Sequence, residues 1–253
     1  TDSNIRWIID QVSCDPPDVF VPNLVTPAFY AARWIRAAGI PTVGILHSDD
    51  EFYHSIQDEF IFGEPSFAVS SVVCVSQELQ QQVAGRSPST TIPIRIPYGV
   101  PTPENNAELN GLGLRLAFVG RLAEEQKCIS QVTRAFCRAV TEVSGTTATI
   151  FGDGPDKPNV ERILNTEGAG LPIVLAGNVP SDEIQQKLTE TSDVIALLSD
   201  YEGLPISLLE AMACGIVPVC LNIRSGIPEL IEHDVTGVLV NDREDAFVNA
   251  IRK

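Results

Sequence analysis

The stretch Tyr201–Pro218, YEGLPISLLEAMACGIVP, predicts a loop, a helix and the start of a strand in direct succession. Glu202 lies in the loop, and Glu210 lies within the helix eight residues later. Pro205 suits the first helical position, because the N–H that proline lacks would have no partner there. The helix N-terminus behind Gly203 presents backbone N–H groups and a partial positive charge, which favours an anion beside this loop. An ordinary amphipathic helix with two solvated glutamates would show the same pattern, so the rest of the sequence has to decide between the two interpretations.

The composition indicates a folded, acidic protein that is large enough for two domains. A length of 253 residues reaches the upper limit for one hydrophobic core, and 44% apolar with 20% charged residues argues against a disordered chain. The 17 basic and 33 acidic residues give a net charge of −16, which argues against nucleic acid or an anionic membrane surface as a general partner. Any bound phosphate must therefore be held locally, by helix ends and one or two cations.

The cysteines and the apolar runs favour a cytoplasmic location. No C-x-x-C pair occurs, so neither a zinc site nor a disulfide framework is indicated, and reduced thiols fit the cytosol. We expect neither a transmembrane segment nor a signal peptide, and nothing in the sequence indicates association with a membrane. The six cysteines are Cys14, Cys74, Cys128, Cys137, Cys214 and Cys220.

Short apolar runs alternate with helical segments along the chain, a pattern typical of parallel sheets in α/β proteins. The polar stretch Pro101–Gly113 interrupts the alternation and is the best candidate for a linker, so we expect a first domain over residues 1–105 and a second over 106–253. The second series predicts a doubly wound sheet, which binds ligands beyond the carboxyl ends of its strands. The expected strands are Asp18–Val21, Thr42–Leu46, Ser71–Val75 and Ile94–Ile96, then Leu114–Val119, Ala148–Phe151, Ile173–Ala176, Val194–Leu198, Val217–Leu221 and Val238–Val240. The expected helices are Asn4–Val12, Phe29–Ala38, Gln77–Ala84, Ile129–Val143, Asn159–Asn165, Ser181–Thr191, Pro205–Cys214 and Pro228–Ile231.

Glycines and two cations gather at the predicted strand ends of the second domain. Arg121 can bind two oxygens of a phosphate at once, whereas Lys127 acts as a point charge. A diphosphate would use both cations and the helix end at Leu204. Tight turns would also explain the glycines, and none of these loops matches the G-x-G-x-x-G fingerprint of nicotinamide dehydrogenases. The glycines at these ends are Gly120, Gly152, Gly177 and Gly203.

Four segments together resemble the second domain of GT-B glycosyltransferases, specifically family GT4. They are FVGRL followed by Lys127, then FGDGP, then EGLPISLLEAMACGIVPV, then IPELIEHDVTGVLV, and they run in order from about Leu114 to Asp242. The shorter segments LHSDD, VCVS and PYGV resemble the second half of the first domain of that family. The resemblance implies a GT-B fold, in which two Rossmann-like domains with parallel sheets face a cleft. We expect the first domain to be truncated here, because the family's version is longer.

The resemblance also implies a donor site. Arg121 and Lys127 match the pair that holds the donor diphosphate in the family. Glu202 matches a glutamate near the donor sugar, and Glu210 matches one that hydrogen-bonds the nucleotide ribose. His47 aligns with a histidine near the transferred sugar. Further donor-binding positions are Gly120 and Gly152 at the rim, Gly203, Leu204 and Pro205 facing the sugar and phosphates, and Asn178 and Val179 beside the nucleobase.

Three positions depart from the family pattern. Cys128 follows Lys127 where the family usually has glycine, and Tyr98 precedes Gly99 where it usually has asparagine. Arg224-Ser225-Gly226 stands where two glycines are common, near the donor phosphates. These departures concern the donor pose most directly.

The resemblance implies a retaining glycosyltransferase that moves a hexose from a UDP- or GDP-linked donor to an acceptor hydroxyl of a glycan, a lipid-linked molecule or a small molecule. Arg121, Lys127, Glu202 and His47 are the catalytic candidates, with Glu202 orienting the sugar. We expect no cofactor and no metal, because no D-x-D pair follows a strand of the second domain and fixed cations take its place. The adjacent acids Asp49 and Asp50 are interpreted as solvated loop charges.

Two alternatives remain open at this point. A nucleotide-sugar epimerase of the same fold would need acidic and histidine groups on both sides of the sugar, for which His47 and His233 are the candidates near motifs. A non-catalytic module that only binds nucleotide-sugars is the third hypothesis.

Overall fold

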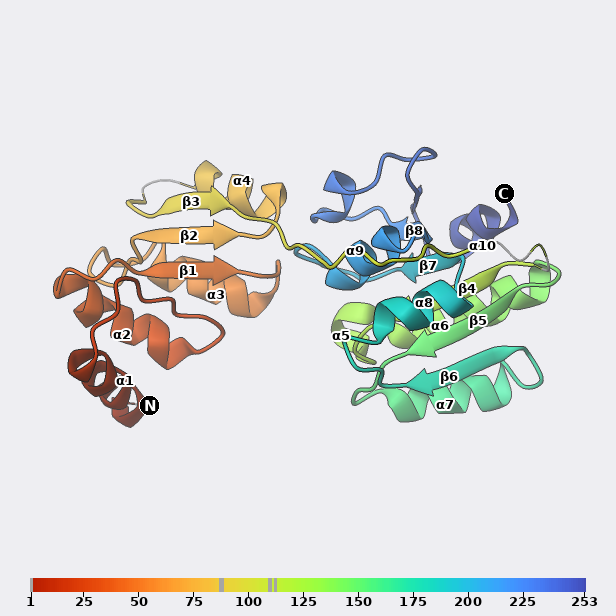
Figure 1. Cartoon of the computed structure of the whole chain (residues 1–253), viewed down its shortest axis with the longest axis horizontal. Helices are drawn as coiled ribbons and strands as arrows, with labels where there is room; N and C mark the ends of the chain where they lie inside the picture. The colour runs from red at the N-terminus through yellow and green to blue at the C-terminus, as the bar shows by residue number, and fades with distance from the viewer. Residues whose placement is uncertain (1, 87–88, 109–110, 112) are drawn as a thin grey trace. The chain divides into compact units, whose positions relative to one another are not determined.

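The computed structural model describes residues 2–86, 89–108, 111 and 113–253, and these form two compact units (Figure 1). The first contains the chain up to Tyr98 together with Glu202–Leu204, and the second contains Gly99–Tyr201 and Pro205–Lys253. The expected linker belongs to the second unit, because Ala107 N donates to Cys214 O at 2.7 Å and Gln185 Nε2 donates to Pro101 O at 2.8 Å. Its described residues lie in neither helix nor strand, while Leu109, Asn110 and Leu112 lie outside the described part.

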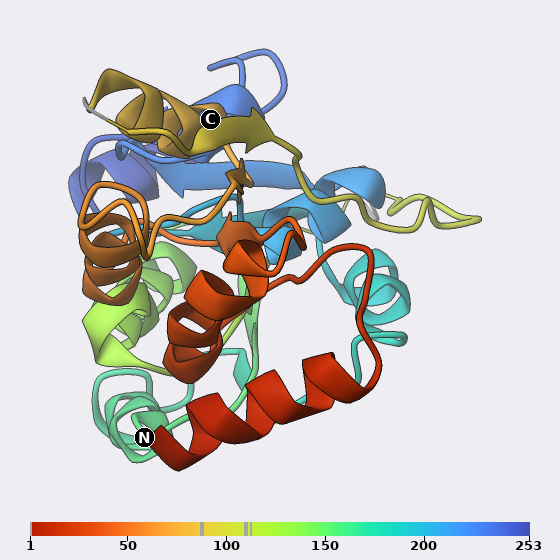
Figure 2. The ribbon, with the colours of Figure 1, turned by 90° about the vertical axis from the view of Figure 1, so that its left-hand side faces the viewer.

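The first unit is built on a three-stranded parallel sheet in the order β1-β2-β3. Gly39, at φ +90°, lies just past the end of α2 (Thr26–Ala37), as expected for a helix stop. The Ser76 hydroxyl accepts from Leu79 N at 3.2 Å and caps α4 (Gln77–Gly85), as expected. The helix α1 packs beside α2 (Figure 2). The elements of this unit are α1 (Asp2–Cys14), α2 (Thr26–Ala37), β1 (Val43–Leu46), α3 (Glu51–Phe60), β2 (Ser71–Cys74), α4 (Gln77–Gly85) and β3 (Ile92–Arg95).

Two expectations for the first unit were wrong. Asp18–Val21 is not a buried strand: Phe20 makes one isolated bridge to Thr42, and prolines on both sides provide no N–H for a longer ladder. Asp49 and Asp50 lie directly before α3, a helix that the sequence did not predict, and both carboxylates accept hydrogen bonds instead of being only solvated. The Asp50 carboxylate caps this helix by accepting from Tyr53 N at 3.0 Å, and Asp49 accepts from His54 Nε2 at 2.7 Å.

The second unit is a six-stranded sheet in the order β6-β5-β4-β7-β8-β9, and every pair of neighbours is parallel. Counted along the unit this order is 3-2-1-4-5-6, which is the doubly wound arrangement. The expected strand ends agree with the observed ones to within one residue. The strands are β4 (Arg115–Val119), β5 (Thr147–Phe151), β6 (Ile173–Gly177), β7 (Val194–Leu197), β8 (Val217–Leu221) and β9 (Val238–Val240).

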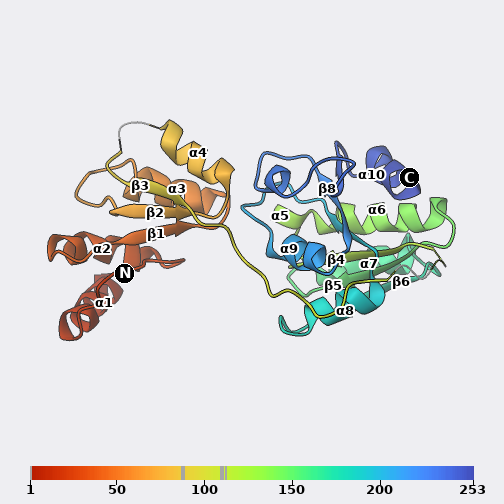
Figure 3. The same cartoon turned by 45° about the horizontal axis from the view of Figure 1, so that its top comes forward.

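Helices cover both faces of this sheet (Figure 3). Leu116 and Phe118 of β4 contribute to the hydrophobic cluster that includes α6, α7 and α10, whereas Ala117 contributes to the cluster that includes α8 and α9. This alternation along one strand explains why the strands read as nearly continuous apolar runs. The helices are α5 (Glu124–Lys127), α6 (Ile129–Glu142), α7 (Lys157–Thr166), α8 (Ile184–Thr191), α9 (Ile206–Ala213) and α10 (Asp245–Arg252), with a 3₁₀ turn at Ile227–Glu229.

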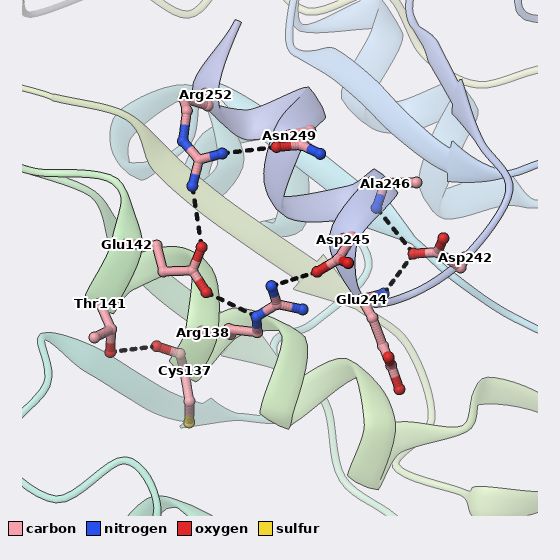
Figure 4. A network of polar contacts seen from close by, with 10 residues as sticks. All are labelled: Cys137, Arg138, Thr141, Glu142, Asp242, Glu244, Asp245, Ala246, Asn249 and Arg252. Carbon is pink, nitrogen blue, oxygen red and sulfur yellow. Dashed lines mark hydrogen bonds and ion pairs between the residues drawn. The ribbon is translucent and has the colours of Figure 1, made fainter.

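Surface ion pairs join α6 to α10 (Figure 4). Arg138 pairs with Asp245 of α10 and, at 2.7 Å, with Glu142 one turn further along α6. Arg252 pairs with Glu142 at 3.0 Å. Each such exposed pair contributes at most about 1 kcal/mol, so the buried contact between α6 and α10 is the main source of stability on this face. In the part of the chain that the structure describes, no helix has the length and apolar character needed to cross a bilayer.

Candidate functional site

A cavity of about 320 Å³ lies at the carboxyl ends of β4, β5 and β6 in the second unit. Successive strands are added to one side of β4 up to β6 and to its other side from β7 onward. Doubly wound sheets bind ligands at the carboxyl ends of their strands near such a change of order. The lining includes Gly120 and Arg121 after β4, Gly152 and Asp153 after β5, Asn178 and Val179 after β6, and Glu210 on α9. Six of these seven were expected from the sequence, and the cavity brings them together.

Backbone hydrogen bonds join the strand-end loops that line this cavity. Gly120 N donates to Phe151 O at 3.1 Å, and Gly152 N donates to Gly177 O at 2.7 Å. Gly152 has φ +139°, and a Cβ atom there would lie 1.9 Å from Gly120 O. Glycine at position 152 is therefore required by the close packing of two loops, whatever binds above them.

Arg121 and Lys127 are placed differently with respect to the cavity. The Arg121 side chain is exposed and lines it. Lys127 ends the short helix α5 and does not line the cavity, but a Cβ atom on Gly120 would lie 3.6 Å from Lys127 Cε. The lysine side chain therefore passes beside a lining residue. Cys128, which follows it, has φ 48° and ψ 42°, the left-handed conformation for which glycine is the usual residue.

The pKa values of two acidic side chains at the cavity are shifted in opposite directions. Burial raises the pKa of Glu210, because the charged form loses its hydration. The pKa of Asp153 is lowered, first by the hydrogen bond from Gly154 N at 2.8 Å and second by Lys157. A carboxylate that lacks hydration gains most from a ligand hydroxyl that donates to it, so Glu210 is suited to bind a hydroxyl group.

The loop before α9 differs from expectation in one detail. Pro205 precedes the helix as its N-cap residue instead of being its first helical residue, because its carbonyl accepts from Leu208 N at 3.2 Å. Glu210 lies within α9, as expected. Glu202, Gly203 and Leu204 are grouped with the first unit and do not line the cavity.

His47 follows β1 in the first unit, and both of its ring nitrogens are hydrogen-bonded. Nε2 contacts Asn23 Oδ1 at 2.8 Å, and Nδ1 contacts the hydroxyl of Tyr98, whose ring stacks on the imidazole at a centroid distance of 5.8 Å. Burial lowers the pKa of His47. His47 is thus a neutral, oriented imidazole, and Tyr98, which replaces the usual asparagine of the family pattern, is one of the two groups that orient it.

Five lining residues were missing from the sequence prediction, and two of them, Val119 and Phe151, are the last residues of β4 and β5. Asp153 belongs to the FGDGP segment, which was recognised for its glycines alone. Ile184 is the first residue of α8 and Ser181 lies in the turn before it, shortly after Asn178 and Val179, so the expected helix Ser181–Thr191 could have indicated both. His233 is not among the lining residues: its Nδ1 accepts from Leu239 N at 3.0 Å within a local turn.

Comparison with known proteins identifies relatives of both the sequence and the fold. The family model described as glycosyl transferases group 1 matches residues 113–253. The amylovoran biosynthesis glycosyltransferase AmsK of Erwinia amylovora is 35% identical over 145 residues, which cover 54% of this chain and 35% of AmsK. The uncharacterized glycosyltransferase MJ1607 of Methanocaldococcus jannaschii is 28% identical over 222 residues, which cover 81% of this chain and 55% of that protein. The chain thus spans about a third to about half of these curated relatives.

A solved structure shows the same fold. Anabaena Alr3699/HepE in complex with UDP and glucose matches 98% of this chain and 70% of its own with a TM-score of 0.76 and 18% identity. The structural neighbours are GT-B glycosyltransferases, which confirms the expected fold class. The family model covers more than half of the chain, including the whole cavity. The chain therefore belongs to the group 1 glycosyltransferase family.

Proposed function

We propose that the protein is a retaining glycosyltransferase that moves a hexose from a nucleotide-diphospho-sugar to an acceptor hydroxyl, and that the cavity of the second unit binds the donor. The observation that carries the proposal is the cavity itself, in which Arg121, the strand-end glycines and Glu210 meet beyond parallel strands. The family membership of residues 113–253 supports it.

The proposed mechanism stabilises the leaving nucleotide electrostatically. Departure of the sugar leaves negative charge on the β-phosphate, and preorganised positive groups lower the free energy of the transition state most effectively. Arg121 would bind the diphosphate directly and Lys127 would approach it past Gly120. The N-terminal end of α9 would add a partial positive charge. These fixed charges take the role that a metal ion has in other transferases.

The remaining roles follow from position. Glu210 would accept hydrogen bonds from the ribose hydroxyls, and Asn178 and Val179 would lie beside the nucleobase. Glu202 and His47 are proposed to orient the donor sugar, with the amides of Gly203 and Leu204. The Anabaena neighbour was solved with UDP and a relative from Mycobacterium tuberculosis is GDP-mannose-dependent, so the proposal includes both UDP- and GDP-linked donors. The relative AmsK acts in amylovoran biosynthesis, which favours a glycan acceptor.

The first test is a panel of UDP- and GDP-sugars scored by thermal unfolding. A ligand at about a hundred times its dissociation constant adds about 2.7 kcal/mol to the free energy of unfolding. The donor that stabilises the chain is then supplied to the protein together with candidate acceptors. Transfer with retained anomeric configuration is the expected result. Inversion of a sugar carbon without transfer would favour an epimerase, and binding without turnover would favour a binding module. If no member of the panel stabilises the chain, donor binding is contradicted.

A further inference from the structure

Gln126 connects the turn that carries Lys127 to the loop that follows β7. Its side-chain Nε2 donates to Tyr201 O at 3.1 Å, and its backbone carbonyl accepts from Asp200 N at 2.9 Å. One residue of α5 thus makes hydrogen bonds to two successive residues of another loop. Tyr201 directly precedes Glu202 in the chain, so this connection joins the two loops that bear the proposed donor-binding charges.

The loop that receives these bonds is itself fixed. Arg243 donates from Nε to Leu198 O at 2.7 Å and pairs with the Asp200 carboxylate. Partial burial alone would raise the pKa of Asp200, but the Cys128 thiol and Arg243 outweigh it and lower that pKa. The carboxylate therefore remains charged near neutral pH. Gln126 consequently attaches α5 to a loop that already has its own anchors.

The attachment matters for Lys127 because it is the next residue. Its side chain passes Gly120, which lines the donor cavity. Gln126 and Lys127 are consecutive residues of the four-residue helix α5, so their backbone positions are directly linked. A change in the attachment of Gln126 would therefore move the lysine charge relative to the cavity.

We propose that Gln126 is a positioning residue for Lys127, acting on binding of the donor diphosphate without touching the donor. This inference rests on the proposed function, since it assigns Lys127 to that diphosphate. A substitution at Gln126 removes the side-chain hydrogen bond to Tyr201 O and leaves the backbone one from Asp200 N in place.

The test is a double-mutant cycle with Gln126→Ala, Lys127→Ala and both together, in the full chain. Calorimetry measures the dissociation constants of UDP and GDP, and of UMP and GMP, which lack the β-phosphate. We expect Gln126→Ala to weaken binding of the diphosphate by roughly 2- to 12-fold, as for one lost hydrogen bond, and to leave the monophosphate unchanged. In the Lys127→Ala background, Gln126→Ala should have no further effect. Gln131→Ala, on the exposed side of α6, is the matched control and should change neither constant.

Equal weakening of UDP and UMP, full additivity with Lys127→Ala, or a lower melting temperature with unchanged UDP affinity would each overturn the proposal. Gln126→Met keeps the length of the side chain without its N–H donor, and it replaces Gln126→Ala if the alanine variant does not fold. If the unmodified chain binds neither UDP nor GDP, the proposed function fails together with this inference. If Arg121→Ala and Lys127→Ala weaken binding but Gln126→Ala does not, only this inference fails.

Discussion

Cys128 combines a buried thiol with a backbone conformation that normally belongs to glycine. Its φ of 48° places it in the left-handed region, where a residue other than glycine loses about 1–2 kcal/mol. The residue is 3% exposed, and burial raises the pKa of its thiol to about 11. The buried sulfur thus contributes packing at a position where the backbone is unfavourable.

Substitution separates these two contributions. Cys128→Gly is expected to be more stable than Cys128→Ala by about 1 kcal/mol, because both variants lose the thiol and only glycine relieves the backbone. At Cys137, in the middle of α6, the order should reverse, because glycine in a helix is less stable than alanine by roughly 1 kcal/mol. Thermal unfolding of the four variants measures both differences. The same order at both positions would contradict the account.

His47 offers a test by pH. Its pKa is lowered by burial, so the unfolded chain takes up a proton first as the pH falls below about 6.5, and stability declines in that window. Nitrogen NMR of the imidazole should show titration below pH 6.5, and Tyr98→Phe should raise the pKa, because the neutral ring loses the hydrogen bond to Nδ1. Titration at or above pH 6.5, or no response to Tyr98→Phe, would exclude the proposed orientation. His54→Gln, on an exposed histidine of α3, is the control.

Among the loops, the ends of β4 and β5 pair beside the cavity, where Gly120 N donates to Phe151 O. Gly152→Ala should disrupt this pairing, because the added Cβ would collide with Gly120 O. Gly170→Ala is the matched control: its φ is +80° and no atom lies within 4 Å of the added Cβ, so it should lose only about 1–2 kcal/mol. We expect Gly152→Ala to lose clearly more stability than this control and to lose nucleotide binding as well. Equal losses of stability for the two variants, measured by denaturant unfolding, would show that the loops can separate freely.

The sequence predicted elements well where burial alone determines them. The strands of the second unit are apolar runs bounded by glycine or polar residues, so their ends could be read closely. The helices α3, α5 and α10 were not predicted, whereas α4, α7, α8 and α9, which have eight to ten residues each, were, so length alone does not explain the misses. For α3 a signal was present, since Asp50 stands before Tyr53, Ile56 and Phe60, and all three side chains are buried. The bridge at Phe20 shows the opposite error, in which apolar residues between prolines suggested more pairing than the backbone can form.

For the chain as a whole, the sequence predicted that the loops after β4, β5 and β6 line one cavity, but Gly203 and Leu204, expected at the same site, do not line it. Carboxyl ends of parallel strands share one edge of a sheet, so Arg121, Gly152 and Asn178 could be assigned to one site before the structure was known. The position of Lys127 beside Gly120 depends on the packing of α5 against other loops, which no local pattern encodes. The contribution of α8 to the cavity depends in the same way on packing between helix and sheet.

The central claim is that Arg121 binds the diphosphate of a nucleotide-sugar in the cavity of the second unit. Isothermal titration of UDP and GDP into the unmodified chain and into Arg121→Ala tests it directly, with Arg134→Ala, an exposed arginine paired with Glu167 at 3.0 Å, as the control. Loss of a charge-assisted contact should weaken nucleotide binding by about 10- to 150-fold in Arg121→Ala. The affinity of Arg134→Ala should equal that of the unmodified chain. An affinity in Arg121→Ala equal to that of the unmodified chain would contradict the claim.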